Sequence, residues 1–142
     1  MTYFRDLTKT EAFAEYGAVL DNPVNEYSAV AEDDSVVVEC WGHLIKRIAD
    51  GVWRYHVDDF SEWTNMHGKN KLERHLEYAI DENRPVRLVI AAPKAGAKPR
   101  VAKLDGTKIP KTISIRKDFV GKVVTLDADY FTIDFFRNKI TH

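Results

Sequence analysis

The chain has 142 residues, of which 44% are hydrophobic and 30% are charged, and its net charge is −1. These values exclude an intrinsically disordered chain and are typical of a single globular domain, which we expect to span residues 1–142. The longest apolar run, residues 88–92, is too short to cross a membrane, and the lone Cys40 excludes a disulfide framework. Because the first residues also lack the pattern of a secretory signal, we expect no membrane partner and a cytoplasmic location.

The first predicted element is a helix with a capping-box pattern. Thr8 is followed three residues later by Glu11, so the Thr8 side chain can accept from a free amide while Glu11 accepts from the amide of Thr8. This pattern predicts a helix that ends near residue 16. Residues 26–31 and 36–41 then flank a polar turn and predict a β-hairpin.

A second hairpin is the clearest local prediction, with strands over residues 44–49 and 52–57. The strands are separated by Asp50-Gly51, a favoured two-residue turn in which both residues have positive φ. After an irregular segment, residues 70–82 carry an apolar stripe at helical spacing, and Asn70 is the expected cap of this second helix.

The remainder of the chain is predicted to be mostly β-structure. The nearly continuous apolar run over residues 86–92 predicts a central strand. Further short strands are expected near residues 100–104, 112–116, 122–126 and 130–136. Eight or nine short strands with two short helices predict an α+β fold, with a strongly curled, mainly antiparallel sheet or a small β-barrel.

The small net charge conceals a division of charge between the two halves of the chain. Residues 1–83 carry 17 acidic and 8 basic side chains, whereas residues 84–142 carry 5 acidic and 13 basic ones. The halves therefore have charges of −9 and +8. Such a division requires an anionic neighbour for the basic half, which is either another molecule or the acidic half of the same chain.

Basic residues are densest over residues 94–122, where small residues also let the backbone approach a ligand closely. The side chains that we expect to contact the phosphate groups of DNA or RNA are Lys94, Lys98, Arg100, Lys103, Lys108, Lys111, Arg116 and Lys117. The alternative is a solvated hairpin whose lysines discourage edge-to-edge aggregation.

Aromatic residues gather in the middle of the chain and predict a pocket in which a base could stack. The candidates are Trp41, Trp53, Tyr55 and Trp63. Trp63 is the strongest of them because it lies in the irregular polar segment rather than in a strand. The alternative is that these residues belong to the hydrophobic core, as most strand tryptophans do.

Residues capable of catalysis form no specific pattern. The histidines lack metal-ligand spacing, and the chain has no phosphate-binding glycine loop and no nucleophile elbow. Glu39 lies on an apolar strand, as in metal-dependent nucleases, but Trp41 stands where such a strand has lysine. We therefore expect no catalytic residue, metal or cofactor, and keep hydrolysis of nucleotides or nucleic acid through Glu39, Asp58 or Asp59 as a third hypothesis.

The acidic half suggests a different class of partner. Its carboxylates could form a surface that resembles the phosphate array of DNA and binds a protein, or they could be ordinary solvated turn residues. The residues concerned are Glu26, Glu32, Asp33, Asp34, Glu39, Asp50, Asp58, Asp59 and Glu62. A protein-binding inhibitor or assembly module is therefore the second hypothesis.

The spacing of the aromatic residues resembles that of a known group of base readers. Trp41 after an apolar strand, then Trp53 and Trp63, and then the helix start at residues 68–72 are similar to PUA-like domains, which include EVE and YTH domains. The similarity spans residues 26–104, and the chain departs from it in strand order and in its longer basic C-terminal part. The resemblance implies a small barrel with an aromatic pocket for a flipped or modified base, formed by the three tryptophans, and a basic rim.

The first hypothesis is therefore a non-catalytic domain that binds DNA or RNA. We expect it to read a flipped or modified base and to act in bacterial or phage nucleic-acid metabolism or defence. The oligomeric state and the choice between DNA and RNA stay open.

Overall fold

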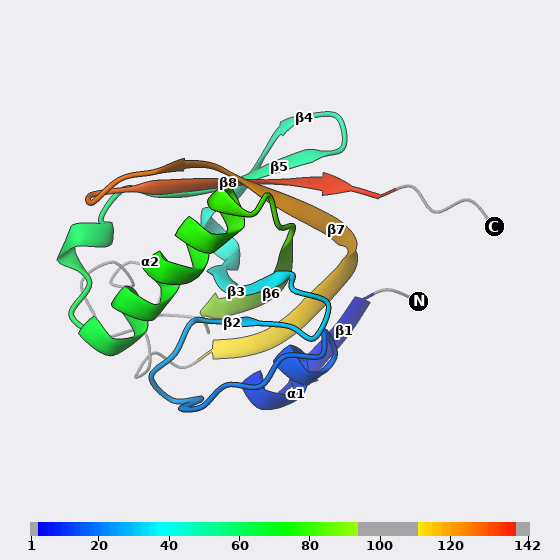
Figure 1. Ribbon diagram of the computed structural model, residues 1–142. Helices are drawn as coiled ribbons and strands as arrows, with labels where there is room; N and C mark the ends of the chain where they lie inside the picture. Colours follow the sequence, from blue (N-terminus) through cyan, green and yellow to red (C-terminus); the bar gives the residue numbers. More distant parts are fainter. Residues whose placement is uncertain (1–2, 94–110, 139–142) are drawn as a thin grey trace.

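The computed structural model describes residues 3–93 and 111–138 (Figure 1). Within these ranges the chain forms two α-helices and two short 3₁₀-helices, which are α1 (Lys9–Ala14), η1 (Gly42–Leu44), η2 (Phe60–Glu62) and α2 (Met66–Asp81). The strands are β1 (Tyr3–Leu7), β2 (Ser28–Val30), β3 (Val36–Trp41), β4 (Ile45–Ala49), β5 (Val52–Val57), β6 (Val86–Pro93), β7 (Lys111–Leu126) and β8 (Phe131–Arg137). The strand predicted near residues 100–104 lies outside the described residues.

Seven strands follow one another across a mixed sheet in the order β2-β3-β6-β7-β8-β5-β4, and β1 pairs with β7. Neighbouring strands are antiparallel except β3 and β6, which are parallel and are connected through the β4–β5 hairpin and α2. The predicted α+β class is confirmed. The expected strongly curled sheet or barrel is not supported, because β2 and β4 lie at opposite ends of the strand order and no pairing within the described ranges joins them.

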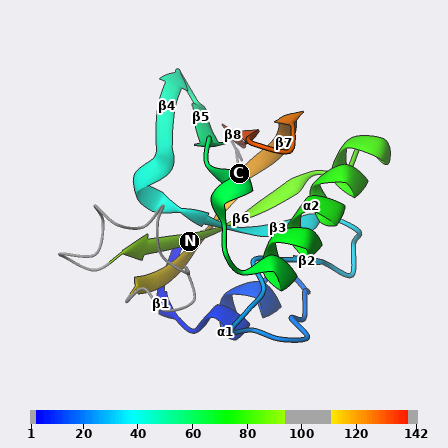
Figure 2. The same ribbon diagram turned by 90° about the vertical axis from the view of Figure 1, so that its left-hand side faces the viewer.

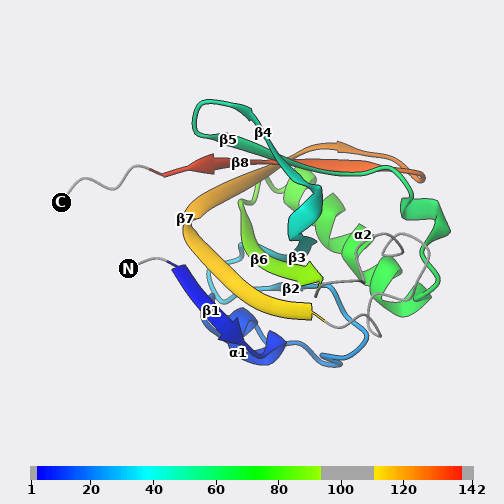
Figure 3. The same ribbon diagram turned by 180° about the vertical axis from the view of Figure 1, so that it is seen from behind.

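Strand β7 connects the two halves of the sheet. Its first part pairs with β6 and β1, and its second part pairs with β8 (Figure 3). The sequence predicted two short strands here, whereas the structure has one strand of 16 residues. Gly121 permits the close approach of β7 to β8, because a Cβ atom at this position would lie only 2.6 Å from the ring of Phe135.

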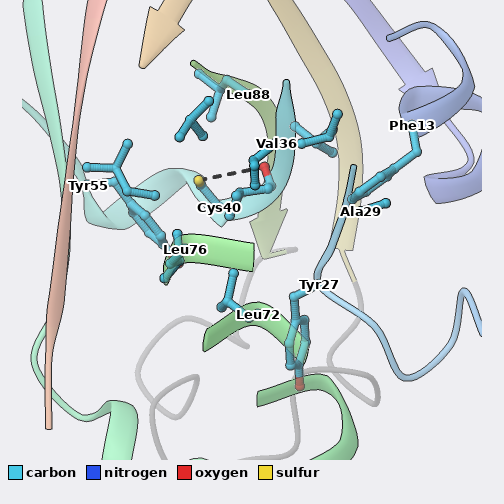
Figure 4. Close-up of a cluster of buried hydrophobic side chains, with 14 of the residues drawn as sticks. Phe13, Tyr27, Ala29, Val36, Cys40, Tyr55, Leu72, Leu76 and Leu88 are labelled. Carbon is cyan, nitrogen blue, oxygen red and sulfur yellow. Dashed lines mark hydrogen bonds between the residues drawn. The ribbon is translucent and has the colours of Figure 1, made fainter. Parts of the chain in front are cut away.

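Helix α2 covers one side of the sheet, here called the inner face (Figures 1 and 2). Its buried residues Leu72 and Leu76 belong to the same hydrophobic cluster as Tyr55 and Leu88 of the sheet (Figure 4). No described helix covers the opposite side of β4, β5, β8 and β7 (Figures 1 and 3). We call this side the outer face, and the residues that alternate onto it are Lys46, Val52, Arg54, His56, Val120, Lys122, Thr132, Asp134 and Phe136.

Side-chain caps determine where both α-helices begin. The predicted capping box is confirmed, with the Thr8 hydroxyl accepting from the Glu11 amide at 3.1 Å and the Glu11 carboxylate accepting from the Thr8 amide at 2.8 Å. Helix α2 begins four residues before the predicted cap, Asn70. The reason is that the side chain of Asn65 accepts from the amide of Gly68 at 3.3 Å and caps the helix there.

The β4–β5 hairpin contains an irregularity that its turn sequence does not predict. Of the two turn residues only Gly51 has a positive φ, at 73°, so the expected turn type is wrong. A regular hairpin with this turn would pair Arg47 with Arg54. A register shift between Arg47 and Ala49 instead pairs Arg47 with Trp53. The bulge therefore moves the Arg47 side chain to the side of the sheet on which Trp53 lies.

Candidate nucleic-acid interface

The structure describes three of the eight predicted phosphate-contacting residues, and each contacts an acidic side chain of the same chain. Lys111 lies 3.4 Å from Glu39, Lys117 lies 3.1 Å from Glu15, and Arg116 donates two hydrogen bonds to Asp118 at 3.0 and 2.8 Å. These contacts match the alternative in which the chain neutralises its own basic segment. The other five residues, which lie outside the described ranges, are Lys94, Lys98, Arg100, Lys103 and Lys108.

Two buried carboxylates organise the charges around α1 and the start of α2. The side chain of Glu39 is 3% exposed and forms ion pairs with Lys9 at 3.0 Å and Lys111 at 3.4 Å. Burial lowers the pKa of Lys9, and the neighbouring Glu39 carboxylate opposes this effect. We call the set formed by Lys9, Glu26, Glu39, Lys71 and Lys111 the internal ion-pair region.

Glu26 is the second carboxylate of this region, with a side chain that is 1% exposed. It accepts from Lys71 at 2.9 Å, from the Asn22 amide at 3.0 Å and contacts His67 at 2.8 Å. Burial alone would raise the pKa of Glu26, but these hydrogen bonds lower it to about 2. Since both Glu26 and Glu39 are buried, neither can belong to an acidic surface that imitates DNA.

The four predicted stacking residues do not form one pocket. Tyr55 is fully buried and Trp41 is 9% exposed, so both belong to the core. Trp63 contacts Phe60 and Tyr27 edge-on, with ring centroids 5.1 and 5.2 Å apart. Its indole N–H donates to Asp59 at 3.1 Å. Three of the four residues therefore have packing roles, as the core alternative expected.

Trp53, the fourth residue, lies elsewhere, in a cluster with Phe119, Arg47, Arg116 and Arg137 that we call the arginine–aromatic cluster. Its ring stacks on Phe119 with centroids 4.9 Å apart and planes inclined by 25°. The guanidinium groups of Arg137 and Arg47 lie 5.3 and 5.9 Å from its centroid, and that of Arg116 lies 4.5 Å from the centroid of Phe119. The structure thus brings two predicted site residues, Trp53 and Arg116, into one cluster through Phe119.

An open hollow of about 520 Å³ lies beside this cluster, at the end of the β4–β5 hairpin. It is lined by Arg47, Asp50, Gly51, Val52, Trp53, Phe136 and Arg137. Arg47 forms an ion pair with Asp50 at 3.0 Å, and the two side chains are 59% and 95% exposed. An ion pair exposed to this extent is weak, so a competing anion can replace Asp50 at little cost.

The outer face carries a charged row that crosses four strands. The row consists of Lys46 on β4, Arg54 on β5, Asp134 on β8 and Lys122 on β7. Arg54 donates two hydrogen bonds to Asp134, at 2.7 and 2.9 Å. Lys46 and Lys122 are exposed and have no ion pair with any residue that the structure describes. With three cations and one carboxylate, the row has a net charge of +2.

Sequence reasoning missed the charged row on the outer face, and it also missed Arg47, Phe119, Phe136 and Arg137 in and beside the hollow. The bulge in β4 places Arg47, and the pairing of Phe119 with Arg137 across β7 and β8 places these two beside each other. Neither feature can be read from local sequence. The alternation of β8 was a usable signal, because it puts Phe136 on the face opposite to Phe135.

Two of the residues considered for chemistry, Glu39 and Cys40, are buried in structural surroundings. In the described parts of the chain no group of three or more His, Cys, Asp and Glu side chains is arranged to hold a metal ion. Glu39 is held by two lysines, and burial raises the pKa of the Cys40 thiol well above its usual value. None of the described helices is both long and apolar enough to span a membrane.

No protein-family model, curated protein or solved structure matches this chain. The resemblance to PUA-like domains therefore stays a prediction from the spacing of aromatic residues. Only the geometry of the molecule itself bears on what it binds.

Proposed function

We propose that this α+β protein binds DNA or RNA without catalysing a reaction, and that the hollow at the end of the β4–β5 hairpin contacts the ligand. One observation carries the proposal: Arg47 and Arg137 lie over the ring of Trp53 at the wall of an open hollow. Guanidinium groups bind phosphate through paired hydrogen bonds, and aromatic rings bind bases through their faces.

The accessibility of these charges supports the proposal further. The Arg47 ion pair with Asp50 lies on the surface. The Arg137 side chain is 45% exposed, and its contact with Asp118, which is 15% exposed, is long at 3.6 Å. The lysines that contact Glu39 are at most 15% exposed. Phosphate can therefore compete for the two arginines far more readily than for the lysines of the internal ion-pair region.

A second candidate function is protein binding along the edge of β4. This strand ends the sheet, so one side of its backbone has no neighbouring strand among the described residues, and Ile48 is 46% exposed. Such an edge can accept a strand from another protein. Lys46 and Arg47 on the same strand oppose this use, because edge lysines and arginines discourage strand addition.

Fluorescence anisotropy with labelled oligonucleotides of about 15 nucleotides tests the proposal. We expect binding at about 50 mM salt that weakens steeply as salt is added. Replacing Arg47 and Arg137 together by Ala should weaken binding about tenfold or more, since each removes a charge-assisted contact. The matched control is Lys69→Ala with Arg74→Ala, which removes two positive charges from α2 and should change affinity less than about twofold.

The proposal is contradicted if no oligonucleotide binds at low salt, or if the control variant loses as much affinity as the Arg47/Arg137 variant. In the first case an affinity purification with nuclease-treated extract, repeated with a variant carrying Ile48→Lys, would test the edge of β4 as a protein-binding site.

A further inference from the structure

We infer that the ligand is single-stranded and that it crosses the outer face along the charged row, from the β4–β5 hairpin towards β7. This inference rests on the proposed function and adds to it a strand type and a path. It follows from the register of four neighbouring strands and from the exposed aromatic ring of Phe136 beside the charged row.

The spacing and the net positive charge of the charged row suit it to bind the phosphates of a nucleic-acid strand. Neighbouring strands lie about 4.8 Å apart, so Lys46 and Lys122 are separated by three strand spacings, or about 14 Å. Between them Arg54 already neutralises Asp134 through two hydrogen bonds. The two lysines therefore retain their positive charge for a ligand, and the carboxylate in the middle of the row does not repel it.

An apolar row runs beside the charged one and presents an aromatic ring. Val52, Phe136 and Val120 are paired across β5, β8 and β7, and the side chain of Phe136 is 47% exposed. Val52 and Phe136 also line the hollow that contains Arg47 and Arg137. The charged row and the aromatic ring lie on the outer face and meet the hollow at Val52 and Phe136, whereas Arg47, Trp53 and Arg137 line the hollow from the opposite side of the sheet. A base can stack on Phe136 while the phosphates on either side contact cations of the row and of the hollow.

This arrangement fits a single strand better than a duplex. In a duplex the faces of the bases are stacked on one another, so an aromatic ring on the surface of a sheet cannot stack on them. In a single strand the bases can turn outward and stack on Phe136. Other sheets that bind RNA use aromatic residues of their open face in this way and hold about two or three nucleotides.

Acidic residues limit the path at the other end of the outer face. Asp127 and Asp129 are exposed in the turn between β7 and β8, and exposed Asp58 follows β5 nearby. Their charges repel phosphate. The exposed Tyr130 lies on this acidic side, with its ring centroid 6.0 Å from that of His56. The strand is therefore expected to cross β8 near Phe136 rather than to run along it towards Tyr130.

Anisotropy titrations with one sequence in single-stranded and duplex form test the inference. We expect the single strand to bind at least tenfold more tightly. Lys46→Ala with Lys122→Ala should weaken single-strand binding about tenfold, and Phe136→Ala about fivefold or more. All three side chains are exposed, so thermal unfolding should be unchanged. Met66→Ala, at a similarly exposed apolar residue on α2, is the matched control for Phe136.

The outcomes separate the inference from the proposed function. Duplex binding that equals or exceeds single-strand binding, and still depends on Arg47 and Arg137, overturns the inference and leaves the proposed function intact. Single-strand binding that is insensitive to Lys46, Lys122 and Phe136 also overturns the inference alone. The absence of binding to either form at low salt overturns both.

Discussion

Two regions of this molecule are rich in charge, and they differ in whether that charge is available. In the internal ion-pair region the carboxylates are 1% and 3% exposed: Glu39 binds Lys9 of α1 and Lys111 of β7, and Glu26 binds Lys71 of α2. On the outer face and in the hollow, most cations are exposed and their ion pairs are weak or absent among the described residues. The comparison shows that the number of basic residues in a segment does not measure its capacity to bind an anion.

Removing the buried carboxylate Glu39 should have the largest effect on stability. Glu39→Gln removes the buried carboxylate that Lys9 and Lys111 contact, and we expect the free energy of unfolding to fall by about 3 kcal/mol. Urea denaturation at neutral pH measures this loss. The matched control is Glu77→Gln on the exposed side of α2, which should stay within about 0.5 kcal/mol of the unchanged protein.

If Glu39→Gln costs no more stability than the control, the internal ion-pair region is not structural and its lysines are candidates for ligand binding. At temperatures where the variant is folded, its affinity for an oligonucleotide should be unchanged, since the ion-pair partners of Glu39 are Lys9 and Lys111 and neither is a proposed ligand contact.

Acid should destabilise the protein in two steps, through groups on the α2 side of the molecule. Burial lowers the pKa of His75 to about 4, and the hydrogen bonds of Glu26 lower its pKa to about 2. Because both pKa values lie below those of the unfolded chain, the unfolded state binds protons first. The stability present at neutral pH is therefore lost between pH 6.5 and 4 through His75, and between pH 4.5 and 2 through Glu26.

The midpoint of urea denaturation, followed from neutral to acid pH, checks this dependence. His75→Asn should flatten the first step and Glu26→Gln the second. A midpoint that stays constant between pH 6.5 and 4 in the unchanged protein would show that His75 is not neutral in the folded state.

Replacing Lys117 should have the smallest effects on stability and on oligonucleotide affinity, and it tests whether this lysine serves folding or ligand binding. Its ion pair with Glu15 is partly exposed, so Lys117→Ala should cost less than about 0.5 kcal/mol. It should also leave oligonucleotide binding within about twofold, although the sequence predicted a phosphate contact here. A tenfold loss of affinity in an anisotropy titration would show that Lys117 contacts the oligonucleotide.

Local signals in the sequence predicted much of the fold. The capping box at Thr8, the hairpins and the central strand β6 depend on neighbouring residues and are confirmed. Strand β1 was missed, because its pairing with β7 joins segments more than 100 residues apart. The open sheet was missed because a barrel and a sheet with a crossover share the same pattern of strands.

The candidate interface was predicted less well than the fold, for reasons that lie in register and pairing. Trp53 and Arg116 were named as site residues, but as members of different groups. The contact of Arg47 with Trp53 depends on a one-residue bulge, and a shift of one residue moves a side chain to the other face of a sheet. The pairing of Lys111 with Glu39 joins distant strands, so the sequence could not show that this predicted phosphate contact lies beside a buried carboxylate.

Backbone amide chemical shifts, recorded while a single-stranded oligonucleotide is added, test most directly the claim that the exposed region binds and the internal region does not. The account predicts shift changes along β4 and β5, at the end of β8 and in the part of β7 that pairs with it, with α1 and the start of α2 unaffected. Changes centred on Lys9, Lys71 and Lys111, with none in the hairpin, would contradict it.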